Sequence, residues 1–371
     1  MSLIYLFIFA FLGVASFNEY SKKEVSKQWY IAIVVVMALT AGLGYALSPD
    51  WIAYFDTFNL LGTINWSDLD RFAYMAGMEK GYLSLNKILI DYGFDFGMVT
   101  LVVASISLAL KTSTFYKYGG LPFLVLFIYA MPNFMFEEHV HIRQGLANGI
   151  AIYSIRFVID RKLIKFLICI FIGYQIHESI IVFVLAYWIA PMKFDEKLIG
   201  WLVVFSIIGF YTGLNSVIEV IMQFMPIGQD KFESYQSDLY ADSGVAIGDF
   251  VKIISIISII VYNKYAVHDK LYCYFRNLFV FGVLLYFFLG KGIFGIRLTG
   301  FYLVFLGLTV GRLIYIFNGD AFKRNFVYMS FVSYTVFLIF WFQIKQGHKS
   351  NFANYRTIFN KEAIYGLWKW N

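Results

Sequence analysis

The stretch from Glu137 to Ile150 places ionisable side chains directly before an apolar helix. Two carboxylates and two imidazoles open the stretch, Arg143 follows them, and the apolar run continues to Ile159. A charged side chain deep in a membrane helix costs roughly 2.5 kcal/mol or more, so it is usually placed there for a reason. Gly145 and Gly149 leave a small face that lets a neighbouring helix approach closely. We therefore take this stretch as the centre of a candidate site.

These residue types offer a cation for phosphate and a base for proton transfer. The guanidinium of Arg143 is a permanent, forked donor that suits the oxygens of a pyrophosphate. His177 and Glu138 are the candidates for the base, because an imidazole titrates near neutrality and a carboxylate can accept a proton. Each residue also has a structural alternative to a catalytic role. His177 could be a buried histidine bonded to a carbonyl group, and Glu138 could pair with Arg143 about one helical turn away.

The same stretch contains residue types that bind zinc, namely Glu137, Glu138, His139 and His141. A His-x-His pair beside carboxylates is a weak signal on its own, however, and the two cysteines of the chain have no metal-ligand spacing. We predict no metal. No G-x-x-x-x-G-K-[ST] or G-x-G-x-x-G motif occurs in the chain, so we also predict no cofactor.

The composition indicates a protein that crosses a membrane many times. Of the 371 residues, 60% are hydrophobic and 15% are charged, whereas a soluble domain is about half apolar and about a quarter charged. Apolar segments fall at 2–18, 29–47, 94–110, 121–136, 142–159, 163–176, 179–192, 198–215, 250–263, 271–290, 293–317 and 325–344. Some are short for a span of about 20 residues, so we predict about 11–12 transmembrane helices. We expect an all-α polytopic membrane protein with one integral membrane domain over residues 1–371.

The basic residues indicate the orientation of these helices. One set of connections carries most of the lysines and arginines, including Lys22, Lys111, Lys162, Lys197, Lys264 and Lys323. By the positive-inside rule this set is cytoplasmic, which places both termini outside. The two long extramembrane segments, external loops at about 48–93 and 216–249, are acidic and lie on the opposite side. The basic residues are spread between helices, so we predict no nucleic-acid partner.

With this orientation, polar residues from distant parts of the chain gather at the outer membrane boundary. They are Asp50, Tyr54 and Glu79 in the first external loop, then Arg143 and Gln144, His177, Lys291 and Arg297, and Tyr355 and Arg356 in the external tail. Positive charge is not expected on this side, so we expect Arg143 and Arg297 together to form a phosphate site. The alternative is that each arginine snorkels to lipid headgroups or pairs with the acidic loops.

Six of these stretches occur in a characteristic order. They are Asp50-Trp51-Ile52-Ala53-Tyr54, Glu79-Lys80-Gly81-Tyr82-Leu83-Ser84-Leu85-Asn86, Ile142-Arg143-Gln144-Gly145-Leu146-Ala147, His177-Glu178-Ser179, Arg297-Leu298-Thr299-Gly300-Phe301-Tyr302 and Tyr355-Arg356-Thr357-Ile358-Phe359. Each stretch is short, but the ordered set resembles the EpsG-like branch of the Wzy polysaccharide polymerases across most of the chain. The run from Glu137 to His141 departs from that family by being more charged.

The resemblance implies a GT-C-like, Wzy-like fold and a glycosyltransferase of the bacterial inner membrane. Such an enzyme works on the periplasmic face and transfers a growing glycan from undecaprenyl pyrophosphate onto a single lipid-linked repeat unit. The product is the O-antigen of lipopolysaccharide or a capsule. The family uses no nucleotide sugar and works beside a Wzz-like chain-length regulator. Residue chemistry and the resemblance together lead us to predict His177, Glu138, Arg143 and Arg297 as catalytic residues. The predicted substrate-binding residues are Asp50, Tyr54, Glu79, Gln144, Lys291, Tyr355 and Arg356.

Other functions of the same pathway remain alternatives. A lipid-linked glycan ligase uses similar external chemistry and is poorly separated by sequence. A flippase for the same lipid-linked unit needs a polar cavity that reaches both membrane faces, whereas charge here is concentrated outside, and no internal repeat of the transporter type is found. A membrane O-acyltransferase needs a cytoplasmic donor, but His177 is predicted to be external.

Overall fold

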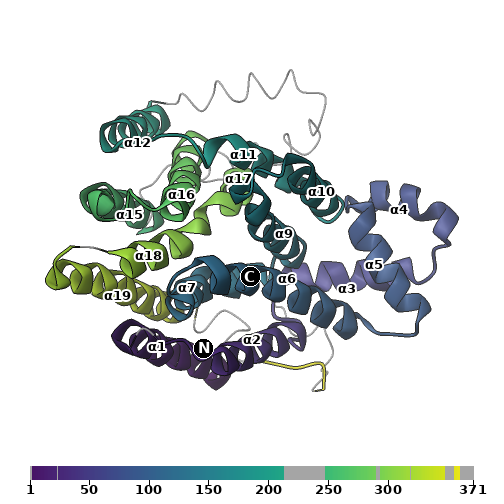
Figure 1. Cartoon of the computed structure of the whole chain (residues 1–371). Helices are drawn as coiled ribbons and strands as arrows, with labels where there is room; N and C mark the ends of the chain where they lie inside the picture. Colours follow the sequence, from purple (N-terminus) through teal and green to yellow (C-terminus); the bar gives the residue numbers. More distant parts are fainter. Residues whose placement is uncertain are drawn as a thin grey trace. The chain divides into compact units, whose positions relative to one another are not determined.

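The chain is helical throughout the part that the computed structural model describes, which comprises residues 2–22, 24–212, 247–289, 293–317, 319–346 and 355–359. Within those ranges the only extended pairing is a single antiparallel bridge between Gly44 and Thr357. The prediction of an all-α fold is therefore confirmed (Figure 1).

Within the described residues, each predicted apolar segment overlaps one or more helices. These are α1 (Leu3–Lys22), α2 (Lys27–Gly42), α6 (Phe96–Tyr118), α7 (Pro122–Tyr129), α8 (Met135–Glu137), α9 (Ile142–Ile159), α10 (Leu163–Tyr174), α11 (Ala186–Ile189), α12 (Glu196–Tyr211), α15 (Ile247–Tyr262), α16 (Lys270–Leu289), α17 (Ile293–Leu303), α18 (Phe305–Ile316) and α19 (Ala321–Gln346). A tight 3-10 segment, Glu178–Leu185, precedes α11.

Five stretches in the described ranges are long and apolar enough to cross a membrane, so the chain is a multi-pass membrane protein. They are Leu3–Lys22, Phe96–Tyr118, Lys270–Leu289, Gly295–Ile316 and Ala321–Ile344. The other predicted spans are helical as well but are shorter or less apolar. The predicted count of 11–12 transmembrane helices and the predicted orientation therefore stay predictions.

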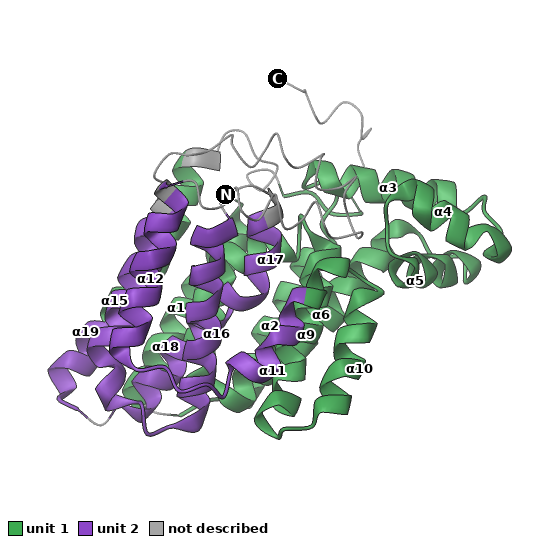
Figure 2. Ribbon diagram, turned by 90° about the horizontal axis from the view of Figure 1, so that it is seen from above, with its two compact units in different colours: residues 1–181, 328–371 green, residues 182–327 purple. Residues whose placement is uncertain are grey.

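The helices form two compact units, which Figure 2 colours separately. Unit 1 comprises residues 1–181 and 328–371, and unit 2 comprises residues 182–327. The prediction of one integral membrane domain over the whole chain stays a prediction.

Most of residues 48–93, the first predicted external loop, is helical, and its external location stays a prediction. It contains α3 (Pro49–Leu61), α4 (Leu69–Ala76) and α5 (Lys80–Asp91), which Figure 1 shows grouped together near the start of α6. Ser48 begins α3 by accepting a hydrogen bond from the backbone N–H of Trp51 at 3.2 Å, which satisfies one of the free donors of the first turn. Gly77 ends α4 in the left-handed conformation, with φ of 60°.

An aromatic core holds these three helices on unit 1. Trp51, Tyr54, Phe58 and Leu61 recur at helical spacing on one face of α3, and all four are buried. They pack in one cluster with residues of α5 and with Phe96 at the start of α6. The face of α3 that carries Tyr54 is therefore fixed relative to α5 and α6.

The second predicted external loop, at 216–249, lies outside the described residues up to position 246. Its last three residues belong to α15, so the acidic residue Asp249 is helical. Its carboxylate accepts a hydrogen bond of 2.8 Å from the hydroxyl of Tyr286.

The small face of α9 receives neighbouring backbone, as its glycines predict. A Cβ atom on Gly149 would lie 3.0 Å from the carbonyl oxygen of Ser107 in α6. A Cβ atom on Gly145 would lie only 2.3 Å from the carbonyl oxygen of Glu137. Both contacts exclude any larger side chain without a shift of backbone, so the start of α9 is seated closely against α6 and the end of α8.

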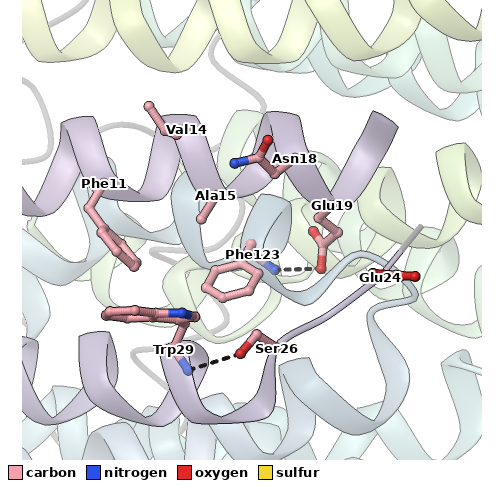
Figure 3. A pocket seen from close by; sticks show the side chains of 9 residues that line it. All are labelled: Phe11, Val14, Ala15, Asn18, Glu19, Glu24, Ser26, Trp29 and Phe123. Carbon is pink, nitrogen blue, oxygen red and sulfur yellow. Dashed lines mark hydrogen bonds between the residues drawn. The ribbon is translucent and has the colours of Figure 1, made fainter. Parts of the chain in front are cut away.

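A pocket of about 230 Å³ lies between α1, α2 and the start of α7 in unit 1 (Figure 3). Glu19 lies beside it, and its two carboxylate oxygens accept hydrogen bonds from the backbone N–H groups of Phe123 (3.1 Å) and Leu124 (3.0 Å). The acid thereby caps the first turn of α7 from another helix. None of the predicted site residues lines this pocket, so it is separate from the candidate site.

Candidate functional site

Arg143, at the start of α9, forms an ion pair with Glu79, the residue before α5. Its Nη1 lies 2.5 Å from Oε2 of Glu79, and only 15% and 13% of the two side chains are exposed. The rings of Tyr54 and Tyr82 lie 5.4 Å and 5.8 Å from the guanidinium carbon, so two aromatic rings flank the cation. Burial raises the pKa of the Tyr82 hydroxyl above its ordinary value, which keeps this ring neutral beside Arg143.

The guanidinium retains hydrogen-bonding capacity beyond this pair. An arginine carries five N–H donors in a fixed fork. Its Nε is buried and has no hydrogen-bond partner among the described residues. A buried donor without a partner is costly, so a ligand that supplied an acceptor oxygen there would be favoured.

Glu79 also joins Arg143 to the turn that carries His177. Its second oxygen, Oε1, accepts a hydrogen bond of 3.0 Å from the backbone N–H of Glu178. The backbone N–H of Tyr82 donates to the carbonyl of Gln175, also at 3.0 Å. The start of α5 is therefore bonded at two points to the connection that follows α10.

Gly81 makes this close approach possible. A Cβ atom at this position would lie 2.5 Å from the carbonyl oxygen of Gln175, a distance that real Cβ atoms do not reach. A glycine is therefore required here by the packing of two backbones.

His177 is 7% exposed and lies in the connection between α10 and the 3-10 segment. Its Nδ1 accepts a hydrogen bond from the backbone N–H of Ser179 at 3.3 Å. A neutral imidazole carries one proton, so a ring that accepts at Nδ1 carries its proton on Nε2. In this tautomer, Nε2 of His177 is a hydrogen-bond donor.

His141, two residues before Arg143, faces Asp50 of α3. Nδ1 of His141 lies 3.1 Å from Oδ2 of Asp50, and the side chains are 40% and 38% exposed. Asp50 and Tyr54 are one turn apart on α3, so α3 presents a carboxylate to His141 and a ring to Arg143. Asp50, Tyr54, Glu79 and Arg143 were all predicted as site residues, and unit 1 gathers them.

Glu138 forms an ion pair with Lys111 and not with Arg143. Its Oε1 lies 2.6 Å from Nζ of Lys111, and only 1% of its side chain is exposed. The ion pairs of the structure join Arg143 to Glu79 and Glu138 to Lys111, so the alternative in which Glu138 pairs with Arg143 is wrong. The placement of Lys111 in a cytoplasmic connection is wrong too, because it lies within α6 and is fully buried.

Lys111 is the centre of a buried polar cluster. Its ammonium has three donors, and they reach Glu137 (2.6 Å), Glu138 (2.6 Å) and the hydroxyl of Tyr129 (3.0 Å). The other oxygen of Glu137 accepts a bond of 2.9 Å from the amide of Asn148 in α9. The cluster thereby links α6, α7 and α8 to the first turns of α9, the helix that carries Arg143.

The remaining predicted residues lie in other parts of the chain. Arg297 is half-buried in α17 of unit 2, and Lys291 lies outside the described residues. Arg143 and Arg297 belong to different units, so their meeting in one phosphate site stays a prediction. Gln144 follows Arg143 in α9 and is half-buried.

The C-terminal segment 355–359 returns to unit 1. The hydroxyl of Tyr355 donates to the carbonyl of Thr40 at 2.7 Å, and the carbonyl of Arg356 accepts from the backbone N–H of Tyr45 at 3.0 Å. These contacts lie just before α3, which carries Asp50. Tyr355 and Arg356 thus support the segment that leads into the site.

The sequence indicated most of these site residues, but it did not indicate which side chains contact one another. The contact between Tyr82 and Arg143 was indicated only weakly, by the position of Tyr82 one helical turn after Glu79. His141 was considered as a metal ligand, and whether it contacts the substrate was left open. Its ring faces Asp50, whereas Nδ1 of His139 faces the carbonyl of Phe134 at 3.2 Å. In the described ranges, no three histidine, cysteine or acidic side chains are grouped so as to hold a metal ion.

A comparison with protein-family models decides the relationship of the chain. The model described as the EpsG family matches residues 27–357. The chain belongs to the EpsG family. Its match covers α2 to the C-terminal segment and includes all the predicted site residues. Searches among curated proteins and among solved structures found no match to this EpsG-family chain.

Proposed function

We propose that this EpsG-family membrane protein is a polysaccharide polymerase. It joins repeat units carried on undecaprenyl pyrophosphate by glycosyl transfer on the outer face of the bacterial inner membrane. Both donor and acceptor are lipid-linked oligosaccharides, and the product is an O-antigen or a capsule. A Wzz-like regulator of chain length is its expected partner.

The observation that supports this proposal most is the packing of Tyr54 and Glu79 around the guanidinium of Arg143. These residues come from three separate stretches of the chain, yet α3, α5 and α9 bring them together. An arginine held by a carboxylate and two rings is ordered before any ligand binds, and an ordered donor loses less entropy on binding.

The role of Arg143 follows from the chemistry of the leaving group. When the acceptor hydroxyl attacks the anomeric carbon of the donor, the bond from that carbon to the pyrophosphate oxygen breaks and the electron pair leaves with undecaprenyl pyrophosphate. Arg143 neutralises the charge that develops there. His177, with its proton on Nε2, donates a further hydrogen bond to a phosphate oxygen. One displacement of this kind inverts the anomeric configuration.

The test is a gel of surface polysaccharide from a deletion strain that carries Arg143→Ala. We expect loss of the polymer ladder, with a single repeat unit still attached and the protein still in the membrane. Arg156→Ala is the matched control on the same helix, because Arg156 lies in the last turn of α9 and stacks on Tyr153 at 3.4 Å. A full ladder from Arg143→Ala would remove the arginine from the reaction.

The deletion strain itself separates the rival functions. A polymerase defect leaves single repeat units on the surface. Repeat units trapped on the cytoplasmic face would indicate a flippase. Long chains that remain lipid-linked would indicate a ligase.

A further inference from the structure

The pair formed by Asp50 and His141 has the geometry of an oriented base. An ionised carboxylate only accepts hydrogen bonds, so the 3.1 Å contact between Oδ2 of Asp50 and Nδ1 of His141 requires a proton on Nδ1. The neutral ring then carries its lone pair on Nε2. This is the tautomer opposite to that of His177, whose Nδ1 accepts. Of these two histidines, His141 is the one that presents a proton acceptor at Nε2.

Both partners of the pair are held by rigid elements. The backbone N–H of His141 donates to the carbonyl of Phe136, and its own carbonyl accepts from Gly145 in the first turn of α9, each at 2.8 Å. Asp50 lies in the first turn of α3, whose start is capped by Ser48. A base that is held by its backbone and by a carboxylate meets its substrate in one orientation.

The pair is also accessible and close to the phosphate-binding arginine. About 40% of the His141 side chain and 38% of the Asp50 side chain are exposed. Asp50 contacts His141 and Tyr54 contacts Arg143, and these two residues of α3 are roughly 6 Å apart along the helix. The imidazole and the guanidinium therefore lie beside one another along α3. One can receive the acceptor hydroxyl while the other binds the diphosphate.

We propose that His141 is the catalytic base of the transfer and that Asp50 is its positioning residue, an assignment that rests on the proposed polymerase function. The acceptor hydroxyl hydrogen-bonds to Nε2 of His141. As its oxygen forms the bond to the anomeric carbon, the proton passes to Nε2 and the pyrophosphate departs with the bonding electron pair. The resulting imidazolium is stabilised by Asp50 and returns its proton to water before the next cycle.

The first test uses the purified protein in liposomes, with lipid-linked repeat units extracted from the deletion strain as substrate. We expect His141→Gln to lower kcat by about a hundredfold or more, the usual contribution of a general base, with KM close to the wild-type value. His268→Gln is the matched control, because His268 is exposed in the connection between α15 and α16. It should polymerise at the wild-type rate.

The role of Asp50 is tested by measuring kcat and KM separately in Asp50→Asn and by asking whether Asp50→Glu restores activity. Asp50→Asn should lower kcat about tenfold with KM unchanged, because the amide no longer selects the tautomer with the proton on Nδ1. Asp50→Glu should recover part of the loss. A rise in KM with unchanged kcat would instead make Asp50 a substrate contact and overturn its positioning role.

A spectroscopic measurement tests the assignment independently of activity. In nitrogen-15 NMR spectra of histidine side chains, the resonances that disappear in His141→Gln belong to His141. We expect them to show a proton on Nδ1 in the wild type and a mixture of tautomers in Asp50→Asn. A proton on Nε2 in the wild type would overturn the inference, whatever the activity of the variants.

The outcomes also separate this inference from the proposed function. Wild-type polymer length from His141→Gln overturns the assignment of the base and leaves the polymerase proposal standing. A wild-type protein that does not lengthen the repeat units overturns the polymerase proposal, and the catalytic assignment falls with it.

Discussion

Glu79 holds Arg143 although 64 positions separate them in the chain. One oxygen of the carboxylate accepts a hydrogen bond from the guanidinium, and the other accepts one from the backbone N–H of Glu178, the first residue of the 3-10 segment. A single acidic residue therefore sets the position of the arginine relative to the turn of His177. Its removal should disturb both sides of the candidate site at once.

We expect Glu79→Gln to destabilise the protein by about 1–3 kcal/mol, because it leaves a largely buried guanidinium without its countercharge. The polymer ladder should shorten or disappear. Thermal unfolding in detergent and the polysaccharide gel measure the two effects. Asp70→Asn is the matched control, because it breaks the Asp70–Lys80 pair, whose side chains are 74% and 53% exposed. An exposed pair contributes only about 0–1 kcal/mol, and a larger loss from Asp70→Asn than from Glu79→Gln would contradict this account.

Gly81→Ala should separate α5 from the connection that follows α10. The new methyl group would overlap the carbonyl oxygen of Gln175, and overpacking of this kind costs about 1–3 kcal/mol. We expect weaker polymerisation with normal membrane insertion. Gly200→Ala in α12 is the control, since no atom lies within 4 Å of the added Cβ. Equal effects of the two substitutions on the polysaccharide ladder would show that the Gln175 contact does not matter.

Lys111→Met should be far more harmful than Glu138→Gln. The first substitution leaves Glu137 and Glu138 buried without their cation, at a cost of about 3–5 kcal/mol. The second keeps an acceptor oxygen for Lys111 and Tyr129 and removes the excess negative charge, so we expect stability within about 1 kcal/mol of the wild type. Thermal unfolding and polymer length are the measurements.

Lys117→Met is the control for this comparison, because Lys117 is exposed in the last turn of the same helix. The triple variant Lys111→Met, Glu137→Gln, Glu138→Gln should recover part of the loss, since it removes all three charges. If Glu138→Gln alone abolished polymer in a stable protein, Glu138 would regain its predicted place as the base.

The pair of Asp269 and Arg312 in unit 2 predicts an acid-sensitive fold. Asp269 accepts hydrogen bonds from Nε (3.0 Å) and Nη2 (2.5 Å) of Arg312 and from the backbone N–H of Tyr272 (2.8 Å). Burial is the largest influence and would raise the pKa of Asp269, but these donors and the charge of Arg312 outweigh it. The pKa therefore lies below the ordinary value of 3.8.

A carboxyl group with a lowered pKa in the folded state stabilises the fold fully above its ordinary pKa, and this contribution is lost as the pH falls through the lowered value. We expect the thermal midpoint to fall when the pH is taken below 3.8. Asp269→Asn should be less stable at neutral pH and should show a smaller acid dependence. An unchanged acid dependence in that variant would assign the effect to other carboxyl groups.

The apolar segments were predictable because length and composition alone reveal a helix that must satisfy its backbone within a membrane. The helices within residues 48–93 were not predicted, because helices were identified only by the length of their apolar segments. Ser48-Pro49 is a start signal and Gly77 is a stop signal, and both lie in the sequence. These capping residues could have revealed the helices within the predicted external segment.

Partners across the chain were not predictable from spacing. Residues about one helical turn apart can pair, and by this rule the nearest carboxylate to Arg143 with a suitable spacing is Glu138. The actual partner, Glu79, is brought in by the packing of α5 against α9 and the connection after α10, which no local pattern encodes. Lys111 was misplaced for the same reason, because the carboxylates that allow its burial follow it by 26 and 27 positions.

The pairing of residues 355–359 with the segment before α3 has a consequence for biosynthesis. Tyr45 and Leu43 bond to backbone groups near the end of the chain, at Arg356 and Ile358. The helices of unit 1 that are translated first therefore lack this contact until Tyr355, which follows Thr40 by 315 positions, has been synthesised. Synthesis of residues 355–359, rather than insertion of the first helices, sets the moment at which the segment before α3 can form all its hydrogen bonds.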